Sequence, residues 1–195
     1  VTHAQNVSPS TGFNLDYKSR GTRGQYEWQG AREKNLSLAF SHTGKKYSVH
    51  AGYIYNMGNL KENGGILRDR DITDTVFERP ELLDVRLNDA RNLFKNNTFY
   101  VVQSYGVPLR QLTDEDFSIA RNSTIFFGYS FLYSRFYKRY TDTKAESGDF
   151  YENWYVSPER SYDSIFESLL SNRLFVQIQP WDRDGAVGVI NAGIG

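Results

Sequence analysis

Cysteine is absent from this chain of 195 residues, and histidine is scarce. Without thiols, a disulfide scaffold, a thiolate metal site and a cysteine nucleophile are all excluded. The histidines, His3, His42 and His50, are too scattered in the sequence to indicate a zinc site.

An excess of either charge sign is also absent, because Lys plus Arg and Asp plus Glu both number 23. Proteins that bind nucleic acid through its phosphates usually carry a basic excess. We therefore expect no nucleic-acid partner, and the balance equally disfavours a polybasic membrane-surface module.

Long apolar runs are missing as well, since no stretch approaches the roughly 18 residues of a transmembrane helix. Aromatic residues are abundant instead: 14 Tyr, 13 Phe and 3 Trp make up 15% of a chain with a mean hydropathy of −0.60. Tyrosine and phenylalanine are typical of β-strands, whose pleated surface accommodates rings. The composition favours an all-β fold over a helical bundle.

Strict alternation of apolar and polar residues predicts where the strands lie. Two such segments flank Thr43-Gly44 and predict a hairpin. In all we expect about seven strands, at residues 13–18, 36–41, 47–55, 98–106, 123–140, 173–179 and 186–195.

The segment 123–140 is the most informative of these strands. Strands of globular proteins usually span about 5 to 6 residues, whereas a membrane-spanning strand needs about 9 to 11. Ile125, Phe127, Tyr129, Phe131 and Tyr133 share one face, and Gly, Ser and Lys residues occupy much of the other. The length and the polar second face favour a strand between lipid and a wet interior.

The connections between the predicted strands alternate in length. Residues 21–32, 57–96 and 141–170 are long and charged and fall on one side of the sheet. The turn at Thr43-Gly44 and the segments 108–122 and 180–185 fall on the other. Long loops on one side and shorter turns on the other are typical of an outer-membrane β-barrel. Residues 162–170 have apolar spacing that fits short helical turns within a loop.

Three stretches resemble a known family, the "putative porin" family of the Bacteroidetes outer membrane. They are residues 51–66, where a Tyr-rich strand ends in Glu-Asn-Gly-Gly-Ile, residues 85–105, with Val-Arg-Leu-Asn-Asp-Ala-Arg-Asn at their start, and residues 173–195, with Asn-Ala-Gly-Ile-Gly at their end. The resemblance implies an antiparallel transmembrane β-barrel in the bacterial outer membrane, with no catalytic or cofactor residues. Such porins are longer, so we expect residues 1–195 to form a single barrel segment that is incomplete at its C-terminus. An odd strand count also sits badly with an even-stranded barrel, unless one strand is wrongly divided.

Alternation assigns side chains to two faces. The lumen-facing set predicted to wet a pore and tune its ion preference is Asn14, Asp16, Lys18, Ser37, Ser41, His50, Ser130, Ser134, Lys138, Arg173, Gln177 and Gln179. The lipid-facing set is Leu36, Leu38, Phe40, Val49, Ala51, Tyr53, Tyr55, Phe127, Tyr129, Phe131, Leu174, Val176 and Ile178. A charge facing lipid at mid-depth costs about 2 to 4 kcal/mol, which explains why this apolar set carries none. The alternative is that the polar set is the solvated face of a soluble sheet, or a plug network inside a barrel.

Aromatic residues near the predicted strand ends form a candidate girdle at the lipid–water boundary, where a ring contacts lipid while its OH or NH stays hydrated. These residues are Tyr47, Tyr100, Tyr133, Tyr137, Tyr140 and Trp181. Trp154 and Tyr155 lie in a long loop and could instead stack on carbohydrate.

Other motifs carry little chemistry. The acidic clusters Asp69/Asp71/Asp74 and Asp182/Asp184 fit solvated loops better than calcium sites. No nucleophile accompanies His42 and His50. We predict no enzymatic activity, no catalytic residue, no metal and no cofactor.

These patterns favour an outer-membrane β-barrel for passive diffusion of small solutes. Its expected partners are outer-membrane lipid and other envelope proteins. One alternative is a non-conducting structural or accessory barrel of an envelope complex. Another is a soluble extracellular β-sandwich that binds sugar or peptide through aromatic loops.

Overall fold

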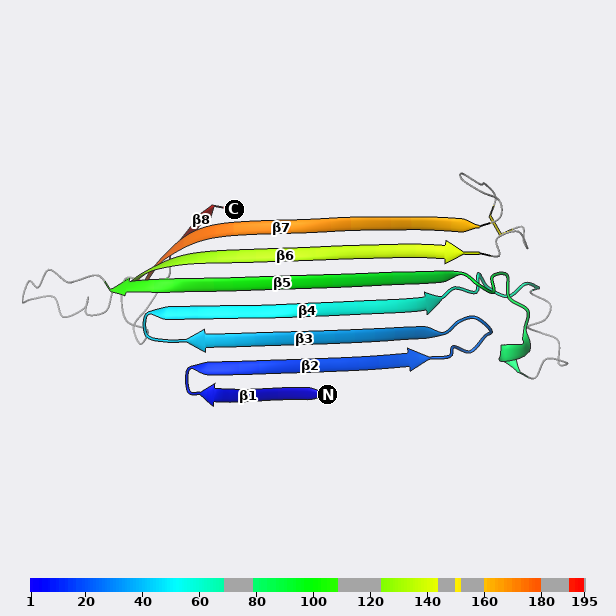
Figure 1. Cartoon of the computed structure of the whole chain (residues 1–195), viewed down its shortest axis with the longest axis horizontal. Helices are drawn as coiled ribbons and strands as arrows, with labels where there is room; N and C mark the ends of the chain where they lie inside the picture. Colours follow the sequence, from blue (N-terminus) through cyan, green and yellow to red (C-terminus); the bar gives the residue numbers. More distant parts are fainter. Residues whose placement is uncertain (69–78, 109–123, 144–149, 152–159, 180–189, 195) are drawn as a thin grey trace, which may run out of the picture.

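A computed structural model describes residues 1–68, 79–108, 124–143, 150–151, 160–179 and 190–194. These residues form one antiparallel sheet of eight strands, each paired with its neighbours in sequence (Figure 1). The strands are β1 Thr2–Ser8, β2 Thr11–Thr22, β3 Ala31–Thr43, β4 Tyr47–Lys61, β5 Arg91–Pro108, β6 Thr124–Asp142, β7 Ser161–Gln179 and β8 Ile190–Ile194. The predicted all-β, antiparallel fold is confirmed.

Helix is nearly absent from the described residues. They contain a single 3-10 turn, η2, at Pro80–Leu82. In this part of the chain, none of the helical structure has the length or apolar character to cross a membrane.

The predicted hairpin around Gly44 is present. β3 and β4 pair from Ala31↔Leu60 to Thr43↔Ser48, and the amide of Gly44 donates to the carbonyl of Tyr47 at 2.8 Å. β5, β6 and β7 are longer still, and β6 pairs with β7 from Asp142↔Ser161 to Thr124↔Gln179.

Two sequence predictions about the strands are wrong. Thr2–Ser8 forms a strand that the alternation did not indicate, so the described residues contain eight strands rather than seven. Residues 162–170 are the first half of β7 and not helical turns. The long edge of β6 supplies a backbone partner to every residue there, and this pairing outweighs the helical spacing of the apolar side chains.

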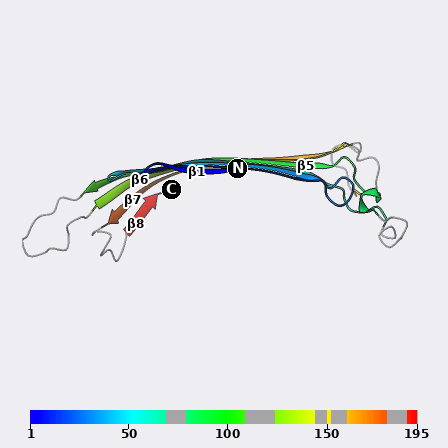
Figure 2. The same ribbon diagram turned by 90° about the horizontal axis from the view of Figure 1, so that it is seen from below.

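The sheet is a single curved layer (Figure 2). β1 and β8 are its two edges, so the sheet is open, consistent with part of a barrel wall. No second sheet packs against it among the described residues, and the sandwich alternative requires one.

The only buried hydrophobic residues of the described chain are Leu83, Leu87 and Ala90, in the connection after β4. The sheet therefore has no apolar core of its own. Large apolar side chains of the strands stay exposed, including Phe127, Leu170 and Leu174.

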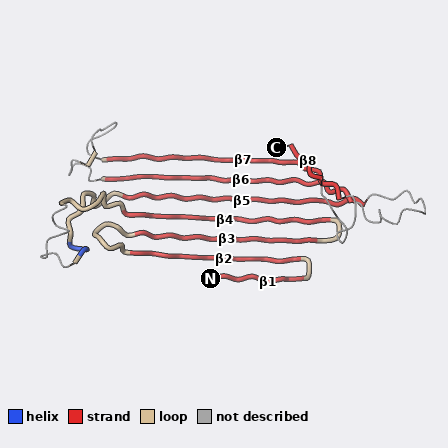
Figure 3. Tube along the Cα trace, turned by 180° about the vertical axis from the view of Figure 1, so that it is seen from behind, coloured by secondary structure: helices blue, strands red, loops and turns tan. Residues whose placement is uncertain are grey.

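The connections lie at the two ends of the strands (Figure 3). Residues 23–30, 62–90 and 143–160 connect β2–β3, β4–β5 and β6–β7 at one end, here called the long-connection end. The β1–β2 and β3–β4 turns lie at the other end. The β3–β4 turn at Thr43-Gly44 was predicted there, whereas most of the other two predicted connections, within residues 109–123 and 180–189, lies outside the described part.

Candidate functional site

The strand register sorts the side chains into two faces. Directly opposed residues of an antiparallel pair share a face, and the pairs Asp16↔Ser37, Ser41↔His50 and Ser130↔Arg173 follow this rule. Every residue predicted to line a lumen lies on one face, here called the polar face. Every residue of the predicted lipid-facing set lies on the opposite face, here called the apolar face.

Hydroxyl, amide and carboxylate groups of neighbouring strands bond to one another across the polar face. Asp16 accepts a hydrogen bond from Thr2 at 2.6 Å and lies 2.9 Å from the Lys18 ammonium. Thr98 and Ser134 hydroxyls lie 2.9 Å apart. Hydrogen bonds of this kind between neighbouring strands stabilise the sheet and keep the short polar side chains low on its surface.

Aromatic rings cover glycines on the same polar face. The ring of Tyr100 lies over Gly52, and an added Cβ at Gly52 would fall 2.5 Å from ring atoms. The same arrangement places Phe94 over Gly58 and Phe175 over Gly128. Because each ring lies against the backbone of the next strand, large residues take up little height above the polar face.

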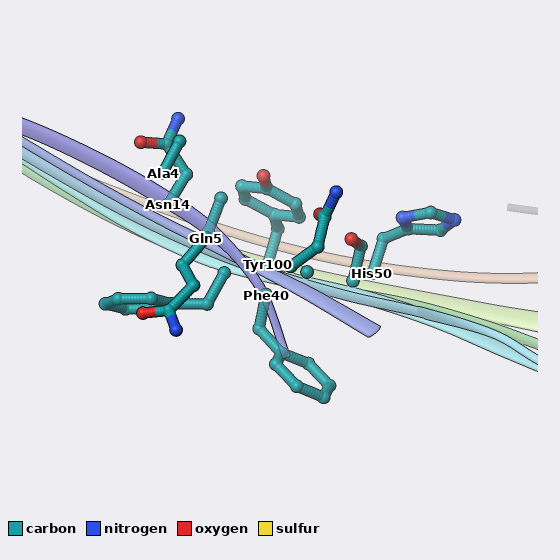
Figure 4. Close-up of a pocket in the computed structure, with 11 residues that line it drawn as sticks. Ala4, Gln5, Asn14, Phe40, His50 and Tyr100 are labelled. Atoms are coloured by element: carbon teal, nitrogen blue, oxygen red, sulfur yellow. The ribbon is translucent and has the colours of Figure 1, made fainter. Parts of the chain in front are cut away.

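A hollow of about 360 Å³ lies over β1 to β5 near the short turns. Ala4, Asn14, His50 and Tyr100 extend from one side of the strands there, whereas Gln5 and Phe40 extend from the other (Figure 4). Since the sheet is one layer thick, side chains of both faces border this hollow. Asn14 and His50 border the hollow beside Tyr100 on the polar face. His42 lies on the apolar face, so the two hairpin histidines do not form one site.

Tyrosine hydroxyls donate to three amide side chains of the apolar face. Tyr53 donates to the Asn97 amide oxygen at 2.9 Å, and Tyr129 donates to that of Asn172 at 2.7 Å. Tyr47 donates to the side-chain oxygen of Gln103 at 2.9 Å. Each bond joins adjacent strands diagonally, so these three pairs of polar groups are satisfied without water.

The predicted aromatic girdle divides between the two faces. Tyr47, Tyr133 and Tyr137 lie on the apolar face, whereas Tyr100 and Tyr140 lie on the polar face. A single outward girdle cannot contain all five. Tyr100 was placed near a strand end because β5 was predicted to begin at residue 98, but β5 begins at Arg91. Trp181, Trp154 and Tyr155 lie outside the described residues.

The long connections pack together into a loop cap, made of residues 23–30, 62–68, 79–90, 143 and 150–151. Leu87 and Phe150 both lie within 3 Å of where a Cβ of Gly64 would stand, so Gly64, at φ +66, fits where a larger residue would not. Trp28 donates from Nε1 to the carbonyl of Ala90 at 2.8 Å. These contacts join three connections that are far apart in sequence.

A buried carboxylate ties the β6–β7 connection to the end of β6. Asp142 is 1% exposed and accepts a hydrogen bond from the Tyr151 hydroxyl at 2.9 Å. The Tyr140 hydroxyl oxygen lies 2.6 Å from that of Tyr151, so a chain of hydrogen bonds links Tyr140, Tyr151 and Asp142. Burial, reinforced by the hydrogen bonds with Tyr140 and Asp142, raises the pKa of the Tyr151 phenol above its ordinary value of 10.0.

Metal-binding clusters of three or more His, Asp or Glu residues are absent from the described part of the chain. The acidic clusters at Asp69/Asp71/Asp74 and Asp182/Asp184 lie outside it. The residues that sequence reasoning missed are those of the cap, such as Trp28, and Asp142 at the end of β6. Trp28 and Ala90 are 62 positions apart, and no local pattern connects them.

Comparison with known proteins gives one family. Residues 1–190 match the model of a family described as "putative porin". No curated protein and no solved structure matches the chain.

Proposed function

The chain belongs to the "putative porin" family, and from this we propose that it is part of an outer-membrane β-barrel that lets small solutes diffuse passively along its polar face. The family match supports a porin-like barrel at a coarse level. Membrane location, conduction and the solutes are parts of the proposal.

The observation that carries the proposal is the contrast between the two faces of a single-layer sheet. Phe127, Leu170 and Leu174 of the apolar face are 54%, 61% and 67% exposed, and no second layer covers them among the described residues. A contiguous apolar surface of this kind needs an apolar environment. In a closed β-barrel, neighbouring strands satisfy all backbone N–H and C=O groups, so the apolar outer face can contact lipid.

Strand dimensions fit a bilayer. From Ile125 to Tyr133 the apolar face of β6 is uninterrupted. Nine residues extend about 30 Å along a strand. A tilt of about 40° reduces this to a height near the ~25 Å apolar band of outer-membrane barrels.

The polar face would line the lumen. It carries both charge signs, with Asp16 and Lys18 on β2 and Lys138 on β6. Fixed charges beside a water-filled path set ion preference, and the loop cap at one end of the strands narrows the entrance. Tyr47, Tyr133 and Tyr137 remain candidates for the girdle, with Tyr47 and Tyr137 toward opposite ends of the apolar band.

The test compares adjacent cations on opposite faces of β6. Lys138→Gln removes a charge from the polar face, and Arg139→Gln removes one from the apolar face. We expect Lys138→Gln to make the pore more selective for cations and Arg139→Gln to leave its selectivity unchanged. Reversal potentials measured in a salt gradient across planar lipid bilayers report this selectivity. Lys138→Glu should shift it further, and Asp16→Lys in the opposite direction.

Two outcomes would contradict the proposal. Equal selectivity in all variants would mean that the polar face does not line the conducting path. A membrane-inserted protein without conductance would support the alternative, a structural or accessory barrel of an envelope complex.

A further inference from the structure

The apolar face continues past its apolar band toward the long-connection end, and there its charged residues are all basic. Among the described strand residues, no Asp or Glu lies on this face. The cations, here called the basic belt, are Arg32, Lys34, Lys61, Arg91, Lys95, Arg135 and Arg139. By contrast, the acidic residues of the described strands, including Asp16, Glu33 and Glu167, lie on the polar face.

The basic belt begins where the apolar band ends. On β3 the next outward residue after Leu36 is Lys34, and on β6 the next after Tyr133 is Arg135. The register pairs Lys61 of β4 directly with Arg91 of β5, and it places Lys34 of β3 and Lys95 of β5 on either side of Met57 of β4. The belt is therefore a continuous patch across β3 to β6.

Aromatic contacts hold three of these cations without neutralising them. The Lys61 ammonium lies 4.1 Å from the centre of the Trp28 ring, and the Arg91 guanidinium 5.2 Å from it. Arg135 lies 5.0 Å from the Phe166 ring. Within the described residues, the belt's one ion pair is Arg91 with Asp89, at 4.0 Å. Most of its positive charge is thus available to an external anion.

A hollow of about 580 Å³ lies within this patch. Four cations border it, Arg23, Arg32, Lys61 and Arg91, together with uncharged residues and no carboxylate. Its composition suits an anionic group that approaches from outside the sheet.

Given the membrane location of the proposed function, we infer that the basic belt binds the anionic phosphate headgroups of lipids in the leaflet at the long-connection end. Lysine and arginine cannot lie unpaired in hydrocarbon, but their chains can extend from the edge of an apolar band to the headgroup level. The ligand must present negative charge directly beside an apolar portion, because the belt adjoins exposed aromatic and aliphatic side chains. A phosphate-bearing lipid has this construction, and a soluble anion or an acidic peptide does not.

Two triple variants with equal change in charge test the inference. Lys34→Gln, Lys95→Gln and Arg139→Gln remove three cations of the belt, whereas Lys18→Gln, Arg20→Gln and Lys138→Gln remove three from the polar face. The protein in neutral detergent is titrated with phosphatidic acid or with phosphatidylcholine of the same acyl chains, and bound lipids are counted by native mass spectrometry. We expect the belt variant to bind phosphatidic acid at least about tenfold more weakly, with phosphatidylcholine unaffected, and the polar-face variant to bind like the wild type.

The inference is overturned if both variants lose affinity equally, since net charge alone would then explain binding, or if neither does. Displacement of phosphatidic acid by inorganic phosphate at equal concentration would also overturn it, because the site would then take the free ion. Insertion and conductance of the wild type in phosphatidylcholine vesicles are measured in parallel. A protein that inserts and conducts but shows no preference for phosphatidic acid contradicts the lipid inference alone, whereas one that never inserts contradicts the proposed function.

Discussion

At the scale of single residues, two tyrosines of the apolar face allow a hydrogen-bonded hydroxyl to be compared with one that has no partner. Tyr129 donates to Asn172, whereas the hydroxyl of Tyr133, on the same strand and face, has no hydrogen-bond partner among the described residues. Tyr129→Phe should lower the free energy of unfolding by about 1 to 2 kcal/mol, because the Asn172 amide then faces an apolar environment without a donor. Tyr133→Phe should change it by less than about 0.5 kcal/mol.

Urea titration of the protein in lipid vesicles measures both free energies. Equal costs for Tyr129→Phe and Tyr133→Phe would contradict the assigned role of the hydrogen bond. Asn172→Leu in the Tyr129→Phe background should recover part of the loss, since it removes the unsatisfied amide.

The glycines under aromatic rings give a second prediction at this scale. An added Cβ at Gly58 would lie 2.1 Å from a ring carbon of Phe94, so Gly58→Ala forces the ring to move. We expect a loss of about 1 to 3 kcal/mol in the free energy of unfolding. In a Phe94→Ala background the same change should cost nothing, because the obstructing ring is gone. A cost that is the same in both backgrounds would show that the ring contact is not responsible. Gly21→Ala, whose Cβ would meet only Ala31 O at 3.6 Å, is the control for backbone effects.

At the scale of strands and loops, the residues that alternation grouped together share a face in the strand register within the apolar band. There each strand pairs on both sides, and only one face is apolar, so the residue parity is unambiguous. Beyond the band both faces are polar, as in residues 91–97 with Asn92, Lys95 and Asn96. Alternation therefore loses its signal, and β5 was predicted to begin seven residues too late. The basic belt was missed for the same reason.

The β6–β7 connection provides a prediction that depends on pH. A raised pKa in the folded state means that the Tyr151 phenol stabilises the cap below the ordinary tyrosine value of 10.0, and that this contribution is lost as pH rises above it. Below pH 10, Tyr151→Phe should therefore make the connection about fivefold more sensitive to subtilisin. Above pH 10 the difference from the wild type should narrow, because the Tyr151 phenol ionises in the opened connection and so favours opening of the wild type.

Tyr162→Phe is the matched control, since Tyr162 is 58% exposed and has no hydrogen-bond partner among the described residues. Cleavage rates are compared between variants at each pH, so the protease's own pH dependence cancels. A difference between wild type and Tyr151→Phe that stays constant through pH 10 would exclude the phenol as the titrating group.

At the scale of the whole molecule, the exposed surface area distinguishes this chain from a compact soluble protein of the same mass. A soluble monomer of 22.5 kDa is expected to expose about 9,500 Å². This chain exposes 14702 Å², and its described hydrophobic core is limited to Leu83, Leu87 and Ala90 in a loop. The excess fits a sheet whose outer face is covered by something other than its own chain, which is the condition that a lipid bilayer meets.

Two adjacent valines in the middle of β5 test which face meets lipid. Val101 lies on the apolar face in the row with Ala51 and Phe131, and Val102 lies on the polar face beside His50 and Ser130. Val101→Lys should lower the free energy of unfolding in lipid vesicles by about 2 to 4 kcal/mol, the cost of a cation near the bilayer midplane. Val102→Lys should have a much smaller effect, because a wet interior hydrates the ammonium. Both proteins should stay with the membrane fraction after an alkaline wash and leave it only in detergent. If the two substitutions cost the same, or if the wild type is released without detergent, the sheet does not separate lipid from water.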